Sequence, residues 1–471
     1  MATHDLCFVP AVELDRLIRS GDVSPVEITE AVLARIDRFN PALGAYITVT
    51  ADLARAQARE AEGRARRGER RGPLDGIPYS VKDLEDTAGV RTTYGSKWLE
   101  SNIPSADGAA AGRLRAAGGI LLGKTNTPHF GHKDMSDNLI GPPCRNPWRR
   151  DRTSGGSSGG AASAVASGLG PLAHGSDGAG SIRCPASLCG VVGLKPSAGR
   201  VPYHPNPDYW TARSHNGPIA RTVRDAALML SALAGPDPRD PMSIDAPPQD
   251  YVAACDGDLR GLRVAWSGDL GRLPVDAEVR AITEAAARRF AGLGCAVEAP
   301  ALGWPDVREP HRLIWHVGVA ARQQDRAREH PDWFEPSLMR MIVDAGRISA
   351  LDYGRALLAR APFYQAVGKL FEDYDLLLTP TMPVAAWPVE PDSAAVIEGR
   401  AAPTLLERLT FTFPFNLTGH PAVSVPCGWT REGLPVGLQI VGRWHADAAV
   451  LRAAAGFEAI QPWADRRPPA V

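Results

Sequence analysis

The chain has 471 residues, of which 44% are hydrophobic and 22% charged, the composition of a globular protein able to bury a sizeable core. Its formal net charge of -1 argues against a nucleic acid or a membrane surface as partner. The seven cysteines are scattered without a C-x-x-C pair, and no apolar run reaches the ~18 residues that a spanning helix needs. Because the first residues also lack a signal-peptide pattern, the sequence predicts a cytoplasmic protein with reduced thiols.

The first part of the chain, residues 1–70, is predicted to be helical. Residues 24–27 have the sequence Ser-Pro-Val-Glu, which is a capping box with proline at the first helical position. Apolar side chains follow at helical spacing, namely Ile28, Val32, Leu33 and Ile36. Residues 51–70 continue as a polar helix, and the basic cluster at 64–71 is interpreted as its solvated end.

The second part, about residues 71–235, alternates between strand and helix patterns. A turn at 73–76 leads into a strand at 77–82, in which Lys82 points away from the face that carries Val81. An Ala-rich helix near 107–117 precedes a strand at 120–122, and Thr222 caps an apolar helix that stops at Gly235. Between them lies a Gly- and Ser-rich region, SGGSSGG at 154–160, which runs into another Ala-rich helix.

Residues 235–241 are the most linker-like segment of the chain. Beyond it, about residues 250–410 begin as strand, helix and strand at 262–266, 276–293 and 295–298, and continue with weaker periodicity. This later stretch is predicted to form loops and helices around a largely apolar pocket, because it carries Trp304, Trp315, Trp333 and Trp387. Residues 411–471 supply two closing strands and a helix. The alternation predicts a single α/β domain over 1–471, with a large mixed β-sheet covered by α-helices on both faces.

Three interpretations of the Gly-rich region carry less weight than a fourth. Flexible linkers are often Gly/Ser-rich, but this tract is followed directly by a helix and a second Gly-rich turn. The match to G-x-G-x-x-A at 168–173 closes a helix and leads into a strand, the reverse of the dinucleotide-binding context. A metal site could be drawn from His129, His132, Asp134 and Asp137, but it lacks a second spaced cluster, so no metal is predicted.

The fourth interpretation is nucleophilic serine chemistry at GSDGAGSIR, residues 175–183. Successive backbone N–H groups in such a turn can bind an oxyanion, and Pro185 suits the first turn of a following helix. Ser181 would then lie near a helix N-terminus, where the helix dipole favours negative charge. No G-x-S-x-G motif surrounds Ser181, which weakens a Ser-His-Asp scheme and leaves the identity of the base open.

Four segments of the chain resemble the amidase signature family. They are GIPYSVKD, the block from GGSSGG to SAGRV, GPIARTVRDAALML, and HPAVSVPCG with GLPVGLQIVG. By this resemblance Lys82 is the catalytic lysine, Ser157 is a bridging serine in a cis peptide, and Ser181 is the nucleophile. The oxyanion hole is expected from the N–H groups of Gly178, Ala179, Gly180 and Ser181. Gly131 is expected to contact substrate.

One departure from the family concerns the residue two positions before the nucleophile. The family commonly has glycine there, whereas this chain has Ala179. If that position needs a positive φ, the alanine is strained and the oxyanion hole is reshaped.

The resemblance implies a hydrolase of C–N bonds in amides, anilides or carbamates (urethanes), acting through an acyl-enzyme without a cofactor. Its predicted partner is a small apolar amide or carbamate, and its predicted assembly a monomer or homodimer. Two alternatives remain open. One is the A subunit of a glutamyl-tRNA amidotransferase, although the run GKTNTPHFGHKDMSDN after residue 122 resembles the stand-alone hydrolases more. The other is a binding protein that has kept the fold without activity.

Overall fold

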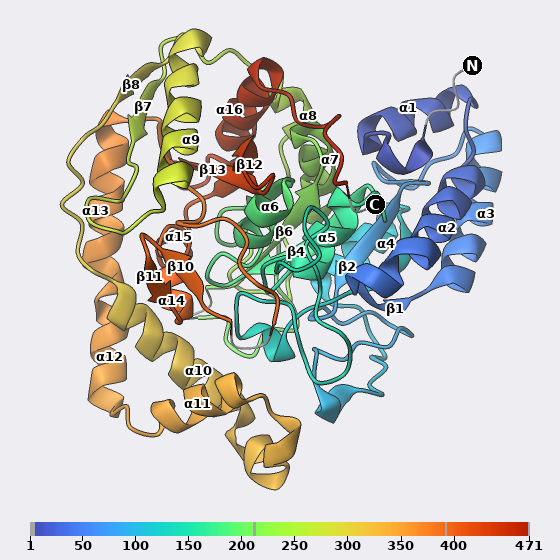
Figure 1. Cartoon of the computed structure of the whole chain (residues 1–471). Coiled ribbons are helices and arrows are strands. Elements are labelled where there is room, and N and C mark those ends of the chain that lie inside the picture. Colours follow the sequence, from blue (N-terminus) through green and yellow to red (C-terminus); the bar gives the residue numbers. More distant parts are fainter. Residues whose placement is uncertain (1–4, 211–212, 391–392, 470–471) are drawn as a thin grey trace.

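The computed structural model describes residues 5–210, 213–390 and 393–469, and an 11-stranded mixed sheet runs through its centre (Figure 1). The predicted lack of a signal peptide rests partly on residues 1–4, which lie outside the described residues. In sheet order the strands are β1 (Tyr46–Val49), β3 (Ile120–Thr125), β2 (Pro78–Lys82), β4 (Leu172–Asp177), β6 (His215–Ala220), β5 (Val192–Lys195), β12 (Ala422–Trp429), β13 (Pro435–Gly442), β9 (Leu376–Pro380), β7 (Arg263–Trp266) and β8 (Ala296–Glu298).

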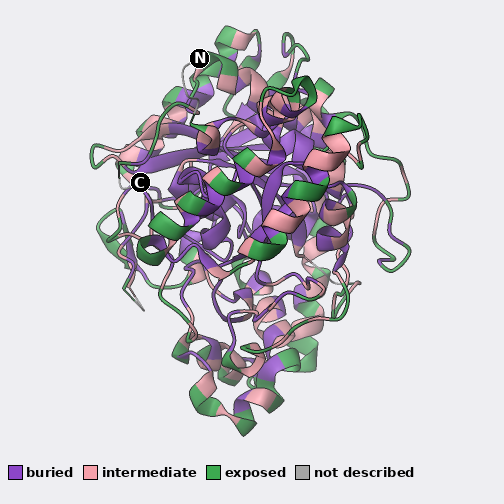
Figure 2. Cartoon of the chain, turned by 90° about the vertical axis from the view of Figure 1, so that its right-hand side faces the viewer, coloured by how far each residue is buried: buried purple, intermediate pink, exposed green. Residues whose placement is uncertain are grey.

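The sheet is parallel in two places and antiparallel elsewhere. Strand β2 pairs in parallel with both β3 and β4, and β7 pairs in parallel with both β8 and β9. The remaining neighbours are antiparallel, including the long β12–β13 pair. Every residue of β2, β3, β4 and β13 is buried, because helices and loops cover both surfaces of the sheet (Figure 2).

Side chains of β13 show that helices lie on the two opposite faces. Gln439 accepts a hydrogen bond from Arg183 at the start of α6 (Arg183–Cys189). Gly442 packs against Val450 of α16 (Asp447–Ile460). Residues three apart in a strand point to opposite faces, so α6 and α16 cover opposite sides. The predicted α/β domain with a large mixed sheet and helices is confirmed.

Further helices pack around the sheet or connect its strands. They are α4 (Ala109–Ala116), α5 (Gly159–Ala166), α7 (Val223–Leu233), α8 (Tyr251–Ala254), α9 (Ala277–Arg288), α14 (Leu405–Arg408) and α15 (Pro414–Thr418). A hairpin of β10 (Ala395–Ile397) and β11 (Arg400–Ala402) forms a separate small sheet. Within the described ranges, no helix is both long enough and apolar enough to cross a membrane. All seven cysteines are free and buried.

The N-terminal helices α1 (Ala11–Ser20), α2 (Pro25–Leu43) and α3 (Ala51–Arg66) agree with the predicted helical part. The capping box is present, since Ser24 and Glu27 each bond the backbone N–H of the other. The basic cluster at the end of α3 is only partly solvated, which corrects the prediction. Arg64 forms a bidentate pair with the buried Asp75, and Arg70 pairs with Asp15.

The stretch from 300 to 400 is more regular than its weak periodicity predicts. The region contains four helices, α10 (Arg308–Glu329), α11 (Pro336–Ala345), α12 (Ala350–Leu358) and α13 (Arg360–Asp373). In Figure 1, α10, α11 and α12 lie at the lower left of the molecule, and α13 lies above α12 along its left side. Helices α10, α11 and α12 pack mainly on one another and have few buried residues, so their apolar stripes are narrow. Helix α13 packs on α15 as well. The linker-like segment at 235–241 does not separate domains, because Asp237 and Asp240 are buried within it.

Candidate active site

The ends of two parallel strands bring the predicted catalytic residues together. Lys82 is the last residue of β2, and Asp177 is the last residue of its parallel neighbour β4. Ser181 follows β4 within a turn that leads directly into α6. Because the carboxyl ends of parallel strands meet at one edge of a sheet, side chains far apart in sequence converge there.

Lys82 is fully buried. Within the described part of the chain, its amine forms hydrogen bonds only with serine oxygens. Its Nζ lies 2.7 Å from Ser157 Oγ, 3.1 Å from Ser176 Oγ and 3.2 Å from the Ser176 carbonyl oxygen. Burial lowers the pKa of Lys82 well below its ordinary value, and the charge of Asp177 opposes that shift only in part. The amine is therefore set up to be neutral and able to accept a proton.

Ser157 lies next to Lys82 at the start of α5, and the Gly156–Ser157 peptide is cis, as the resemblance predicts. Gly156 lies close against the backbone of a neighbouring segment, since a Cβ built on it would be 2.7 Å from the Met135 nitrogen. The Ser157 side chain is almost completely buried. It thus presents its hydroxyl to the lysine from a closely packed backbone.

The turn before Ser181 shows how the chain accommodates Ala179. The residue with unusual backbone is Gly180, whose φ is +127°, and Ala179 is not among the positive-φ positions of the described chain. A Cβ on Gly180 would lie 2.2 Å from Thr412 Oγ1, so only glycine fits there. Ala179 therefore causes no backbone strain, and its carbonyl accepts a hydrogen bond from Thr412 Oγ1 at 2.7 Å.

The four expected oxyanion donors are not equivalent. The N–H of Gly180 donates to Asp177 Oδ1 at 2.7 Å, so this group is already engaged, contrary to the expectation. The N–H groups of Gly178, Ala179 and Ser181 have no hydrogen-bond acceptor within the described part of the chain. They are the backbone donors that remain available beside the Ser181 hydroxyl.

A buried ion pair that the sequence analysis missed supports this turn. Asp177 and Arg183 are both completely buried and form two hydrogen bonds of 2.9 Å. Arg183 also donates to Gln439 Oε1 at 2.8 Å and to Asn416 Oδ1 at 2.7 Å, and Asn416 donates to the Asp177 carbonyl at 2.7 Å. Arg183 keeps the pKa of Asp177 below its usual range despite burial. Only the placement of an acid and a base on either side of Ser181 could have indicated this pair from sequence.

Ser157 and Ser181 line one cavity of about 430 Å³. Gly131 also lines it, with a φ of +68°, and a Cβ on Gly131 would lie 3.3 Å from Ser157 Oγ. The opposite wall comes from one face of α10, whose residues in the lining are Ile314, Trp315, Val317, Gly318, Ala321 and Arg322. The lining also contains Asp208 and Arg213, so the cavity is more polar than the tryptophan content predicts.

Of the four tryptophans expected around the pocket, only Trp315 lines this cavity. Trp304 packs edge-on against Phe363, and Trp387 donates its Nε1–H to Met135 Sδ at 3.4 Å. Trp333 stacks on His330. The prediction of a tryptophan-lined pocket is therefore correct for one residue of four, because the others fill separate apolar contacts.

The residues considered for a metal site are separately engaged. His132 Nδ1 contacts the His129 carbonyl oxygen at 2.8 Å, while Asp134 pairs with Arg408 and Asp137 with Lys133. Among the described residues, no group of three or more such side chains is arranged to hold a metal ion. Burial lowers the pKa of both His129 and His132 to about 3, so both imidazoles are neutral packed groups.

Comparisons with known proteins agree with this geometry. A family model described as Amidase matches residues 27–451. An acylamidase of Rhodococcus erythropolis is 41% identical, covering 99% of this chain and 98% of the relative. The A subunit of the glutamyl-tRNA(Gln) amidotransferase from a Roseiflexus species (strain RS-1) is 36% identical, covering 95% of each chain.

Two solved structures extend the likeness to the fold. A bacterial aryl acylamidase of the amidase signature family superposes with a TM-score of 0.91 at 33% identity, covering 97% of both chains. A 6-aminohexanoate cyclic dimer hydrolase gives a TM-score of 0.89 at 32% identity, covering 98% of this chain and 99% of that one. The family match and these relatives together show a hydrolase that cleaves amide C–N bonds. This chain belongs to the amidase signature family.

Proposed function

We propose that the chain is a stand-alone acylamidase in which Ser181 is the nucleophile and Ser157 relays its proton to Lys82. The observation that carries the proposal is the 2.7 Å contact between the buried Lys82 Nζ and Ser157 Oγ, because Ser157 lines the same cavity as Ser181. A hydroxyl both donates and accepts, so Ser157 can pass a proton in either direction. A neutral lysine can accept that proton, which a charged one cannot.

In the proposed reaction, Ser181 Oγ forms a bond to the amide carbonyl carbon. Its proton moves to Ser157 while the Ser157 proton moves to Lys82, and the free N–H groups of Gly178, Ala179 and Ser181 bind the oxyanion. Collapse of the tetrahedral intermediate breaks the C–N bond, and the proton returns along the same path to the leaving amine. Water then attacks the acyl-enzyme, releases the acid and restores the Ser181 hydroxyl.

The proposed substrates are aryl or alkyl amides, including anilides, and carbamate esters of aromatic amines. Carbamates present the same carbonyl to Ser181, so a urethanase activity belongs to the same proposal. Gly131 would let the substrate approach Ser157 closely, since a side chain at that position would fill the space beside its hydroxyl. The ring of Trp315 offers an apolar surface for an aryl or alkyl group.

The test is a substrate panel with the purified chain alone: an anilide, a primary carboxamide, an aryl carbamate and glutamine. We expect hydrolysis of the anilide or the carbamate, and its complete loss in Ser181→Ala prepared in parallel. Activity confined to glutamine would contradict the proposal and favour the amidotransferase reading. If no amide is turned over while the fold is intact, the result would instead support the inactive binding protein.

A further inference from the structure

An arginine in the wall of the Ser181 cavity has no acidic partner. Arg213 lines this cavity, and its guanidinium lies over the indole ring of Trp315, 4.8 Å from the ring centroid. Such a cation–π contact orients the cation without neutralising it. Within the described part of the chain, no aspartate or glutamate forms an ion pair or a hydrogen bond with Arg213. The described residues therefore leave this positive charge without a counter-charge in contact.

The guanidinium of Arg213 is partly open to the cavity. Its Nη1 is buried and has no hydrogen-bond partner among the described residues. Nε and Nη2 also lack a partner there, but they keep accessible surface, and the residue as a whole is half-buried. Charges held away from water are normally paired, because an isolated one is unfavourable. Since Nε and Nη2 are accessible, a ligand in the cavity can supply the missing acceptor.

The charged groups around Arg213 leave an excess of positive charge. Burial, followed by the like charges of Arg360 and Arg322, lowers the pKa of Arg213 to about 9, so the guanidinium is still charged at neutral pH. Tyr353 and Asp208 oppose this shift only in part. Arg322 lines the same cavity, and Asp208 is the one carboxylate among the described lining residues. Two arginines against one aspartate favour an anion in this cavity.

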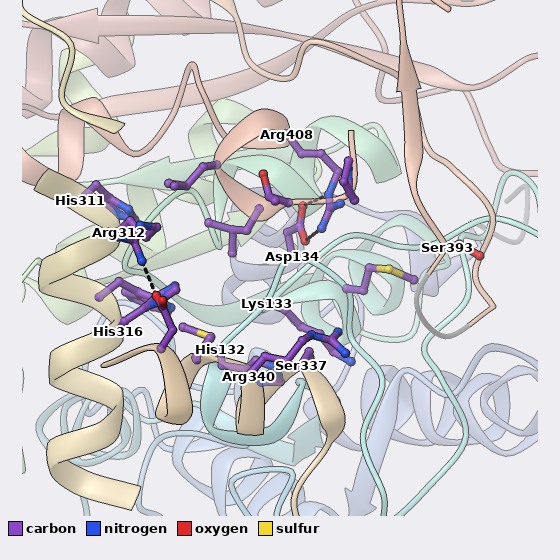
Figure 3. Close-up of a pocket in the computed structure, with 18 residues that line it drawn as sticks. His132, Lys133, Asp134, His311, Arg312, His316, Ser337, Arg340, Ser393 and Arg408 are labelled. Carbon is purple, nitrogen blue, oxygen red and sulfur yellow. Dashed lines mark hydrogen bonds and ion pairs between the residues drawn. The ribbon is translucent and has the colours of Figure 1, made fainter. Parts of the chain in front are cut away.

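The cations of a second cavity, of about 500 Å³ along the same helix α10, show the contrast (Figure 3). There Arg408 forms a bidentate pair with Asp134 through two contacts of 2.7 Å, and Arg312 pairs with Asp344. Cations that are already matched by carboxylates do not attract a further anion. The unmatched charge of Arg213 is therefore a feature of the Ser181 cavity and not of the whole region.

Arg213 also lies close to the turn that would hold the oxyanion. Gly178 of that turn packs against Trp315 and Ser214, because a Cβ built on it would be 3.2 Å from the indole ring and 2.9 Å from Ser214 Oγ. The Arg213 carbonyl accepts a hydrogen bond from Asn416 Nδ2 at 3.1 Å, and Asn416 also bonds to the start of the turn. The guanidinium and the turn thus contact the same indole ring. A substrate carbonyl in the turn would bring a group a few bonds away to the guanidinium.

We propose that Arg213 binds a carboxylate of the substrate, separated from the scissile amide by a short chain or a ring. The guanidinium edge with Nε and Nη2 matches the two oxygens of a carboxylate, and such charge-assisted hydrogen bonds are about twice as strong as neutral ones. The inference rests on the proposed function and narrows its substrates to amides with a carboxylate on the acid side or on the amine side. Arg213 is then a specificity-determining residue.

The test measures binding by isothermal titration calorimetry to the full chain carrying Ser181→Ala, which prevents turnover. Glutaranilic acid carries a carboxylate on the acid side and 4-acetamidobenzoate carries one on the amine side. Their neutral partners are pentananilide and 4-methylacetanilide. At least one anion should bind about 10–100-fold more tightly than its neutral partner, the usual effect of hydrogen bonds to a charged group. If neither anion is preferred, the inference is overturned.

Substitution of Arg213 tests whether this residue causes the preference. Arg213→Gln, in the Ser181→Ala background, should reduce the ratio of the two affinities to about that of a site without charge recognition. Arg312→Gln is the matched control, since it removes the same charge from the paired set of the second cavity, and it should keep the ratio. A ratio that persists in Arg213→Gln would contradict the inference. Thermal denaturation checks the fold, and if Arg213→Gln is unfolded, the comparison of anions with neutral partners still decides.

Turnover by the wild type separates this inference from the proposed function. Hydrolysis of pentananilide with no higher kcat/KM for glutaranilic acid, and no preference for either anion in binding, would overturn the inference and leave the proposed function intact. Binding of an anion that depends on Arg213, without hydrolysis of any of the four amides, would support the inference and count against the proposed function.

Discussion

The two walls of the Ser181 cavity are built in different ways. One wall, called the buried wall here, comes from Ser157, Ser176, Gly178 and Ser181, at the end of β4 and in the segments that lead into α5 and α6. Every residue of β4, α5 and α6 is buried, and the ion pair between Asp177 and Arg183 holds the turn before Ser181. The wall from α10 is buried at only six of its 22 residues and packs mainly on other helices (Figure 2). The proposed reactive atoms thus lie where the core leaves little conformational freedom, whereas the proposed substrate contacts on α10 lie on an element that can vary without disturbing the sheet.

The largest expected effect is on the buried wall, in Ser181→Ala. Removal of the attacking oxygen should lower kcat/KM on an anilide by about 10⁴-fold or more. The melting temperature should stay close to that of the wild type, because no hydrogen bond of the Ser181 side chain supports the described fold. A folded variant with wild-type rate would show that this wall does not carry the chemistry.

The second expected effect is at Lys82. In Lys82→Ala the rate should fall by about 10²–10⁴-fold, the usual contribution of a general base. In the wild type the rate should rise with pH through the lowered pKa of Lys82 and then level off. Burial lowers the pKa of His132 and His174 to about 3, so neither can produce a rise near pH 6–7. The pH–rate profile of the wild type, Lys82→Ala and His174→Gln tests this. A rise that persists in Lys82→Ala but vanishes in His174→Gln would refute a lysine base.

Lys82 also makes folding stability depend on pH. Its pKa is lower in the folded chain than in the unfolded one, where it is about 10.4. Between these two pKa values the unfolded chain binds the extra proton, so the free energy of unfolding should rise with pH. The penalty is full below the folded pKa and disappears above about 10.4. The free energy of unfolding, measured by urea denaturation at several pH values, should rise less steeply with pH in Lys82→Met than in the wild type. An equally steep rise in both proteins would be inconsistent with a neutral buried amine.

A smaller effect on rate, but a large one on stability, is expected for Asp177→Asn. The substitution leaves Arg183 buried without a counter-charge, which should lower the free energy of unfolding by about 3–5 kcal/mol. The rate should fall by about 10²-fold because the oxyanion turn is misplaced. Asp151→Asn is the matched control, since it breaks the exposed pair with Arg149 and should cost about 0–1 kcal/mol. If both variants lost the same free energy of unfolding, the buried ion pair would be no more important for stability than the exposed one.

The smallest expected effect is on the wall from α10, in Trp315→Leu. Loss of the aromatic surface should raise KM for an aryl substrate by roughly 10-fold, with less change in kcat. Trp333→Leu lies in the same helical region but outside both cavities, so its kinetics should match the wild type. If both variants change KM alike, the effect comes from the stability of the helices and not from contact with substrate.

The buried wall could be predicted from the sequence because its constraints are local. The strand ending at Lys82 and the helix beginning beside Ser181 each depend on patterns of a few residues, and the structure contains both. The capping box at Ser24, outside this wall, was predictable for the same reason. Family resemblance added the roles proposed for Ser157 and Ser181, and it correctly predicted the cis peptide at Ser157.

The rest depended on contacts that no local pattern encodes. Thr412, Asn416 and Gln439 reach the turn around Asp177 from more than two hundred residues away. The four helices from α10 to α13 were obscured because their polar faces are wide and their tryptophans serve separate apolar contacts. In such a region the composition indicates that apolar side chains are present, but it does not predict which of them line a cavity.

The order of strands in the sheet has a consequence for biosynthesis. Strands β12 and β13 come late in the chain, yet they lie between β5 and β9 at the middle of the sheet. Before a ribosome has made residues 412–442, the β5 edge has no partner on that side, and the turn around Ser181 lacks Thr412, Asn416 and Gln439. An unpaired buried edge invites pairing with other chains. We therefore expect the nascent chain to need protection from aggregation until its last strands emerge, and to gain a competent Ser181 only then.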